Sequence, residues 1–270
     1  MTNIYKLTFV LRNKEKALLP AYTGHIIRGA VLAKIREEDK ELSEELHKSN
    51  KIRPYRLSPL LPYKSSKFHR TRRGEIKLPK NFPVIFQMGI LHQRLAQAII
   101  KIMLEQQNNG FSLIKHDFSI EKIEIETKTA IDLLKNGDLP ANKFKIIFHT
   151  PTYFNISKQP FPLRFPDPRY LFMNLASIWN AFNTKAQINK EEFYNWLENN
   201  LSVSGFELKT RTAYISKGAP KIGCQGWVHY RLSKDETYNN WVPALALFGE
   251  TSNVGGGRTA GFGCIEFEPR

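Results

Sequence analysis

Residues 82–106 read FPVIFQMGILHQRLAQAIIKIMLEQ and divide into an apolar strand and an amphipathic helix. The strand is expected to end at Gly89, because its apolar residues form a short continuous run. After it, apolar residues recur at helical spacing, which predicts a helix over 90–106 with these side chains facing inward: Leu91, Leu95, Ala98, Ile99, Ile102 and Met103. A strand that leads into a helix is half of a β-α-β unit, so the flanking segments decide the architecture.

The segments on both sides complete such a unit. Residues 5–11 alternate Tyr, Leu, Phe and Leu on one face, and this alternation is typical of a strand. A helix is expected over 23–36 and a shorter one over 40–48. Residues 55–62 look extended with an edge or bulge at Pro59, and 111–128 look like a strand. The resulting order, β-α-β-β-α-β, is that of the ferredoxin-like fold.

The same order of elements returns later in the chain, although no letter-by-letter repeat is visible. Residues 129–142 contain Gly137 and Pro140 and are interpreted as a linker. Beyond it, we expect a strand, two helices, two paired strands, a short helix and a last strand at 144–149, 170–183, 190–200, 206–217, 222–232, 238–249 and 261–267. The sequence therefore predicts an α+β protein with two tandem ferredoxin-like (RRM-like) domains, at 1–128 and 143–270.

The charge balance points to a polyanionic partner. The chain has 40 Lys plus Arg against 25 Asp plus Glu, a formal net charge of 40 − 25 = +15. A chain this basic most often meets nucleic acid, and less often an anionic membrane. Membrane binding is not favoured, because the predicted helices carry mixed charge and no apolar run approaches the ~20 residues of a span. With no recognisable signal peptide, the expected location is the cytoplasm.

The two cysteines, Cys224 and Cys264, exclude a disulfide scaffold or a cysteine-rich zinc site. They are interpreted as small buried side chains and not as nucleophiles. None of the seven histidines is paired at metal-ligand spacing with carboxylates nearby, so no metal site is expected.

The sharpest local motif is GETSNVGGGRTAGFG at residues 249–263, which has six glycines in fifteen residues. Consecutive glycines expose backbone N–H groups and allow close approach to a bulky anion, so Gly255, Gly256 and Gly257 could cradle a phosphate. Arg258 would add a bidentate guanidinium. The alternative is a tight turn with a purely structural role, and the motif matches neither a P-loop nor a dinucleotide-binding fingerprint.

This motif resembles the glycine-rich signature of CRISPR-associated RAMP proteins, specifically the family of endoribonucleases that cleave CRISPR repeats. Further similarity covers nearly the whole chain in the family's order. It comprises GHIIRG at 24–29, LHK at 46–48, YRLSPL at 55–60, TPTYF at 150–154 and GWVHY at 226–230. The resemblance implies two ferredoxin-like domains in tandem, in agreement with the order of elements.

The resemblance also implies a function: binding of CRISPR repeat RNA in a precursor transcript and its cleavage without metal or cofactor. The ribose 2′-hydroxyl attacks the adjacent phosphate, leaving 2′,3′-cyclic phosphate and 5′-hydroxyl ends. Implied partners are this RNA and the subunits of a CRISPR effector complex, and the enzyme would be a monomer or a homodimer. Histidine suits the proton transfers, since its pKa lies near neutrality.

His47 occupies the place of the family's catalytic histidine, and Lys51 and Arg53 supply nearby positive charge. A histidine at a helix C-terminus can also be a simple dipole contact. The family's helix tyrosine is replaced here by Leu32, and its lysine by Arg53. His25 or Tyr22 could take over the second proton transfer, or could equally pack under the sheet.

Two basic clusters are expected to contact RNA, although a run of charges is often just a solvated face. The first is a hairpin in which Phe68 and His69 could stack on bases, and its basic residues are Lys64, Lys67, Arg70, Arg72 and Arg73. The second brackets the strand pair of the second domain and consists of Lys209, Arg211, Lys217 and Lys221.

Two other functions remain open. A non-cleaving RAMP subunit that holds guide RNA in an effector complex would share the fold, the charge and the glycine-rich loop, but would not need His47. A tandem RNA-binding module would need exposed aromatic residues on a sheet strand. Its closest match, residues 261–267, is partial and includes an acidic residue.

Overall fold

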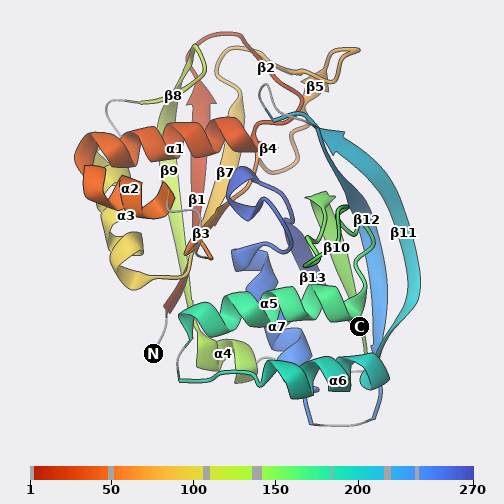
Figure 1. Cartoon of the computed structure of the whole chain (residues 1–270). Coiled ribbons are helices and arrows are strands. Elements are labelled where there is room, and N and C mark those ends of the chain that lie inside the picture. Colours follow the sequence, from red (N-terminus) through yellow and green to blue (C-terminus); the bar gives the residue numbers. More distant parts are fainter. Residues whose placement is uncertain are drawn as a thin grey trace.

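The computed structural model describes residues 3–47, 52–105, 110–135, 142–183, 185–215, 220–234 and 237–270, without the side chain of His47. Two antiparallel sheets lie side by side, and each is covered by helices (Figure 1). None of the helices within these ranges is long and apolar enough to cross a membrane.

The first sheet has the predicted ferredoxin-like topology. Its strand order is β3-β7-β1-β9, with all neighbours antiparallel. Three helices complete the unit. The bounds are β1 (Asn3–Asn13), α1 (Gly24–Glu38), α2 (Lys40–His47), β3 (Tyr55–Leu57), β7 (Pro83–Ile90), α3 (Gln93–Glu105) and β9 (His116–Thr129).

The alternation in β1 places Leu7, Phe9 and Leu11 in the core beneath the helices, where all three are fully buried. Phe9 stacks on Phe86 of β7 with ring centroids 4.5 Å apart. Helix α3 buries Leu95, Ile99 and its neighbours against the same core, as its helical spacing predicts. The core of the first domain is therefore set by the two apolar periodicities in the sequence.

A smaller sheet was not predicted from the sequence. It has the order β2-β6-β5 and consists of β2 (Ala17–Leu19), β5 (His69–Arg70) and β6 (Ile76–Leu78). The segment predicted to be extended over 55–62 is divided at Ser58 and Pro59 into β3 and β4 (Leu61–Pro62). The division follows from Pro59, which has no N–H to continue the ladder with β7. At the other edge, β8 (Phe111–Leu113) pairs with β9.

The second sheet repeats the topology of the first. Its order is β11-β12-β10-β13, again with antiparallel neighbours. The bounds are β10 (Lys143–Thr152), α5 (Pro168–Phe182), α6 (Lys190–Asn200), β11 (Leu201–Ala213), β12 (Lys221–Leu232), α7 (Trp241–Ser252), the 3-10 turn η1 (Arg258–Ala260) and β13 (Ile265–Pro269). The tandem ferredoxin-like fold is thereby confirmed, with β11 beginning five residues before its predicted start at residue 206.

The predicted linker 129–142 includes a short helix, α4 (Ala130–Lys135). Ala130 and Leu133 on this helix are buried in the core of the second domain, together with Ile4 and Leu91 from the first. The two cores therefore meet through shared apolar contacts.

A buried arginine also joins the domains. Arg56 of β3 is 1% exposed and donates from Nε to the carbonyl of Thr251 (3.0 Å) and from a terminal nitrogen to that of Glu250 (2.8 Å). Burial lowers the pKa of this guanidinium, which remains charged in any ordinary buffer. A buried charge is tolerated only when it is hydrogen-bonded, so these two carbonyls at the end of α7 fix β3 against the second domain.

Candidate nucleic-acid interface

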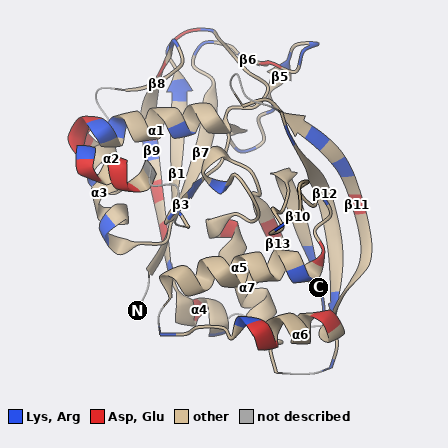
Figure 2. Cartoon of the chain, viewed as in Figure 1, with Lys and Arg blue, Asp and Glu red and all other residues tan. Residues whose placement is uncertain are grey.

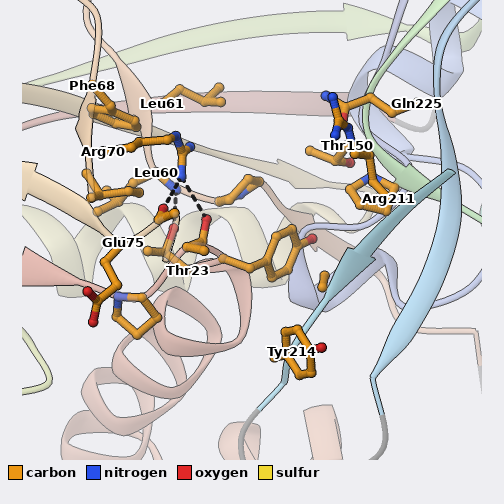
Figure 3. A pocket seen from close by; sticks show the side chains of 18 of the residues that line it. Thr23, Leu60, Leu61, Phe68, Arg70, Glu75, Thr150, Arg211, Tyr214 and Gln225 are labelled. Atoms are coloured by element: carbon orange, nitrogen blue, oxygen red, sulfur yellow. Dashed lines mark hydrogen bonds between the residues drawn. The ribbon is translucent and has the colours of Figure 1, made fainter. Parts of the chain in front are cut away.

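A cavity of about 730 Å³ lies between the two domains. Segments 20–23, 59–62 and 68–76 of the first domain form one side, and 149–151, 211–214 and Gln225 of the second form the other. Figure 3 shows Arg70 on one wall and Arg211 on the opposite wall. The two basic clusters predicted from the sequence therefore converge on one cavity.

Arg70 is held in place by backbone carbonyls. One terminal nitrogen donates to the carbonyls of Ala21 (3.3 Å) and Gly74 (2.8 Å), and the guanidinium lies 5.9 Å from the ring centre of Phe68. Arg211 is exposed beside Thr150 and Gln225 (Figure 3). No ion pair of the described residues includes either arginine, so both can still neutralise a phosphate.

The other predicted cations among the described residues are exposed but do not line the cavity. Lys64, Lys67, Arg72 and Arg73 are exposed on the segment from β4 to β6, and Lys209 lies two residues before Arg211 on β11. Figure 2 shows positive charge around β5 and along β11. Lys217 lies outside the described residues. This exposed charge suits a polyanion that is longer than the cavity itself.

Sequence reasoning missed two lining residues, Tyr214 and Gln225. Tyr214 is 68% exposed at the end of β11, and its ring gives an unpaired base a surface on which to stack. Gln225 donates to the carbonyl of His149 (2.8 Å). An aromatic residue three positions after Arg211 is the signal that could have identified Tyr214. The single carboxylate among the lining residues, Glu75, accepts a hydrogen bond from Thr71 (3.1 Å).

The glycine-rich loop is packed against the protein interior. Gly255 donates its N–H to Asn174 Oδ1 and Gly256 donates to the carbonyl of Tyr153, each over 2.8 Å. A Cβ at Gly255 would collide with that same Tyr153 carbonyl, and one at Gly257 would lie 2.9 Å from the Phe262 ring. Both of these glycines have positive φ, at 70° and 72°. Close packing and left-handed backbone therefore explain why glycine is required here.

Arg258 does not offer the free guanidinium that the sequence predicted. The residue is 8% exposed, and its terminal nitrogens donate to the carbonyls of Ser252 (2.7 Å) and Arg53 (3.0 Å). Burial and the nearby charge of Arg53 lower the pKa of Arg258 to about 10. With two donors used internally, Arg258 joins the glycine-rich loop to the start of β3 instead of projecting toward a phosphate.

One catalytic candidate, Arg53, is hydrogen-bonded to this same loop. His47 is the last residue of α2, but its side chain lies outside the described part of the structure, as does all of Lys51. Arg53 Nε donates to the carbonyl of Leu46 (3.2 Å), and the Arg53 carbonyl accepts from Arg258. The end of α2, the start of β3 and the glycine-rich loop are thereby connected next to His47.

His25 and Tyr22 differ in their capacity to transfer protons. Nδ1 of His25 is buried without a hydrogen-bond partner among the described residues, and burial lowers the pKa of the imidazole. His25 is therefore neutral near pH 7 and can accept a proton. Burial, followed by the nearby Cys264 and Tyr153, raises the pKa of Tyr22 well above its usual value. The Tyr22 ring packs 4.9 Å from Phe262, and the raised pKa keeps its phenol protonated near neutrality.

Asn253, which the sequence did not single out, holds the loop together. With a positive φ of 55°, it places its side-chain nitrogen near the carbonyls of Leu57 (3.1 Å), Phe262 (3.0 Å) and Arg258 (3.3 Å). Its ψ of 172° places it outside the left-handed helical region, in a conformation that is otherwise almost confined to glycine. Asn253 lies immediately before the Val-Gly-Gly-Gly segment, and this position in the sequence could have identified it as a residue that holds the loop.

The structure also bears on the tandem RNA-binding module, the cysteines and a metal site. Phe262 and Phe267, the rings needed by the tandem RNA-binding module, are buried, so they offer no exposed stacking surface. Burial raises the pKa of the Cys224 thiol to about 12, which does not suit a nucleophile. Within the described ranges, no group of three or more histidine, cysteine or acidic side chains could hold a metal ion.

Comparisons with known proteins agree with the predicted family. The model of the family described as CRISPR-associated endoribonuclease Cas6 matches residues 146–265. A Cas6 endoribonuclease from Streptococcus thermophilus is 28% identical over 155 residues, which are 56% of this chain and 62% of that protein. One from Mycobacterium tuberculosis is 30% identical over 130 residues, which are 47% of this chain and 39% of that protein. The aligned region thus spans less than two thirds of either curated relative.

Solved structures agree in fold over nearly the whole chain. A product complex of Cas6 from Thermus thermophilus has a TM-score of 0.79 and 20% identity, and covers 99% of this chain and 100% of its own. A RAMP protein described as binding different RNA substrates has a TM-score of 0.67 and 12% identity, covering 97% and 99%. The family model, which matches less than half of the chain, and the curated relatives agree with the predicted resemblance to the CRISPR-associated Cas6 endoribonuclease family, and the solved structures show that the chain shares their fold.

Proposed function

We propose that this protein is an endoribonuclease that binds CRISPR repeat RNA and cleaves the precursor transcript without a metal ion. The observation that carries the proposal is the cavity between the domains, because two arginines face it from opposite walls and neither is in an ion pair within the described residues. The related Thermus structures, named as product and substrate-mimic complexes of Cas6, support the same assignment by similarity.

In this proposal, binding and cleavage use neighbouring parts of the molecule. Arg70 and Arg211 neutralise phosphates in the cavity, and Tyr214 stacks on a base. Tyr22 and Thr23, the two residues before α1, line the cavity and lead into His25, the second residue of that helix. RNA bound in the cavity would therefore extend toward the end of α2 and His47.

The proposed reaction is an internal transesterification. The ribose 2′-oxygen forms a bond to the adjacent phosphorus while the bond from phosphorus to the 5′-oxygen breaks. A base takes the 2′-hydroxyl proton, and an acid protonates the leaving 5′-oxygen. We assign these proton transfers to His47 and to His25, whose imidazole is neutral at pH 7, with Arg53 and Lys51 stabilising charge on the phosphorane.

Incubation with repeat RNA in EDTA tests the function directly. Cleavage is expected to continue in EDTA and to stop when the scissile nucleotide carries a 2′-deoxy sugar, because the attacking oxygen is then missing. A requirement for Mg²⁺, or cleavage of the deoxy substrate, would contradict the mechanism. Failure of the wild-type protein to cut repeat RNA that it binds would favour the non-cleaving RAMP subunit.

A histidine variant separates cleavage from binding. His47→Ala should slow single-turnover cleavage by about 10²-fold, within the range for a positioned acid or base, while the Kd for the repeat stays within a few-fold. His92→Ala is the matched control, since His92 is exposed just before α3. If His47→Ala cleaves at the wild-type rate, the proton transfers belong to His25 or another residue. Oligomeric state, association with effector subunits and cytoplasmic location remain predictions.

A further inference from the structure

The small sheet β2-β6-β5 has an exposed face outside the cavity between the domains. In its register, Lys77 of β6 lies opposite Leu18 of β2 on one side and His69 of β5 on the other. These three side chains therefore form one row across the sheet, while Ala17, Leu19, Ile76 and Leu78 on the opposite face are buried.

This row forms the floor of a groove of about 710 Å³. Lys16 borders it at the start of β2, and the turn between β8 and β9 contributes Lys115 and His116. Leu18 is 48% exposed in the groove, so its side chain is accessible to an occupant.

The charged side chains that line the groove are all positive. Its lining includes three lysines and two histidines and no carboxylate, and none of the three lysines is in an ion pair within the described parts of the chain. Glu15 and Asp117, which adjoin it in sequence, do not line it, and Asp117 accepts a hydrogen bond from Ser112. The lysines would attract an anionic ligand along the groove.

The groove and the cavity are each lined by one residue of β5. His69 and Arg70 are consecutive residues on this strand, so their side chains point to opposite faces of the small sheet. His69 lines the groove, and Arg70 lines the cavity. A strand of RNA leaving the cavity around β5 would enter the groove.

We propose that the groove binds a single-stranded segment of the same RNA, beyond the part held in the cavity; this inference rests on the proposed function. The three lysines bind successive phosphates, and the exposed Leu18 with the imidazole of His69 contacts the bases. Bases are available to such a floor only when they are unpaired, because a duplex presents mainly its phosphates and sugars. The chemistry of the groove therefore favours single-stranded over double-stranded RNA.

The test compares two RNAs on the full-length protein: the repeat alone, and the repeat with twelve uridines added at its 5′ or 3′ end. One of the two extensions should increase the affinity of the wild-type protein. The triple variant Lys16→Ala/Lys77→Ala/Lys115→Ala, here called the groove variant, should lose this increase in affinity. Its affinity for the repeat alone should change little. The slope of log K against log salt for the extended RNA should fall in magnitude by about 2, from three lost phosphate contacts.

A control variant removes the same charge elsewhere. Lys185, Lys190 and Lys234 are exposed near α6, at the other end of the molecule from β2 and β5 (Figure 1). Their triple alanine variant should retain the gain from the extension. Leu18→Ser should also reduce that gain while leaving the salt slope unchanged, which distinguishes a base contact from charge alone.

The proposal is overturned if neither extension raises wild-type affinity, or if the groove variant keeps the full gain. Equal gains from a single-stranded and a double-stranded extension would also overturn it. Each of these results can occur while the wild-type protein still binds and cleaves the repeat itself. A protein that does not bind the repeat at all would instead refute the proposed function.

Discussion

The glycine-rich loop 249–263 and the wall of the cavity at β11 both present an arginine close to the domain boundary, yet they use it in opposite ways. Arg258 is buried, with its guanidinium on two backbone carbonyls. Arg211 is exposed on the cavity wall and is in no ion pair among the described residues. An arginine can bind a phosphate only with donors that the protein has not already used, so the cavity is the better anion site.

The difference extends to the backbone. In the loop, glycines permit contacts with Tyr153 and Phe262 that a Cβ would prevent. Arg56 and Asn253 then connect the loop region to β3 of the first domain. Glycine content there reflects close packing, and the N–H groups of Gly255 and Gly256 are used in internal hydrogen bonds.

Replacing a loop glycine should produce the largest effect on stability. In Gly255→Ala, the new Cβ meets the Tyr153 carbonyl and the residue is forced to positive φ. Left-handed strain and overpacking together should lower the free energy of unfolding by about 4 kcal/mol, measured by urea denaturation.

Gly29→Ala is the matched control for this substitution. Gly29 lies in α1, and nothing lies within 4 Å of the position that a Cβ would take there, so alanine should raise stability by ~0.5–1 kcal/mol. A Gly255→Ala protein as stable as the wild type would show that the loop is open enough to receive a ligand.

Arg258→Ala should have the next largest effect. It removes two charge-assisted hydrogen bonds and leaves the Ser252 and Arg53 carbonyls without their partner, so the free energy of unfolding should fall by about 2–3 kcal/mol. Arg211→Ala, at an exposed position, should change it by less than ~0.5 kcal/mol. Equal stabilities of the two variants in chemical denaturation would remove the distinction between the arginines.

The smallest effect concerns the pH dependence of stability. Burial lowers the pKa of His25 in the folded state, so below about pH 6.5 the unfolded chain binds more protons at this site. Stability from neutral His25 is present above that pH and is lost as the pH falls toward the folded pKa. Between pH 7 and 5, His25→Gln should therefore lose less stability than the wild type.

His229, whose pKa is also lowered by burial, still contributes in that variant, which makes the expected difference a partial one. Parallel stability curves for the wild type and His25→Gln would contradict this, because they would show that folding leaves the pKa of His25 unchanged.

The main elements of the fold could be predicted because their side chains repeat over many residues. Alternation in 5–11 and helical spacing in 90–106 both correspond to observed elements. The small sheet β2-β6-β5 was missed because strands of two or three residues are too short to show alternation.

The candidate site was only partly predictable. Charge alone identified Arg70 and Arg211, but their convergence on one cavity depends on how the domains pack, which no local pattern encodes. The burial of Arg258 likewise depends on carbonyls of Ser252 and Arg53, the latter 205 residues away along the chain. A sequence motif shows which donors exist, while the fold decides which of them remain free.

The most direct test of this account is the affinity for repeat RNA of Arg70→Ala/Arg211→Ala compared with Arg258→Ala, at a temperature where both variants are folded. Loss of two charge-assisted contacts at ~1.5–3 kcal/mol each should weaken binding by the double variant at least about a hundredfold. Arg258→Ala should bind within a few-fold of the wild type. Wild-type affinity in the double variant, with binding lost in Arg258→Ala, would contradict the account and assign the RNA to the glycine-rich loop.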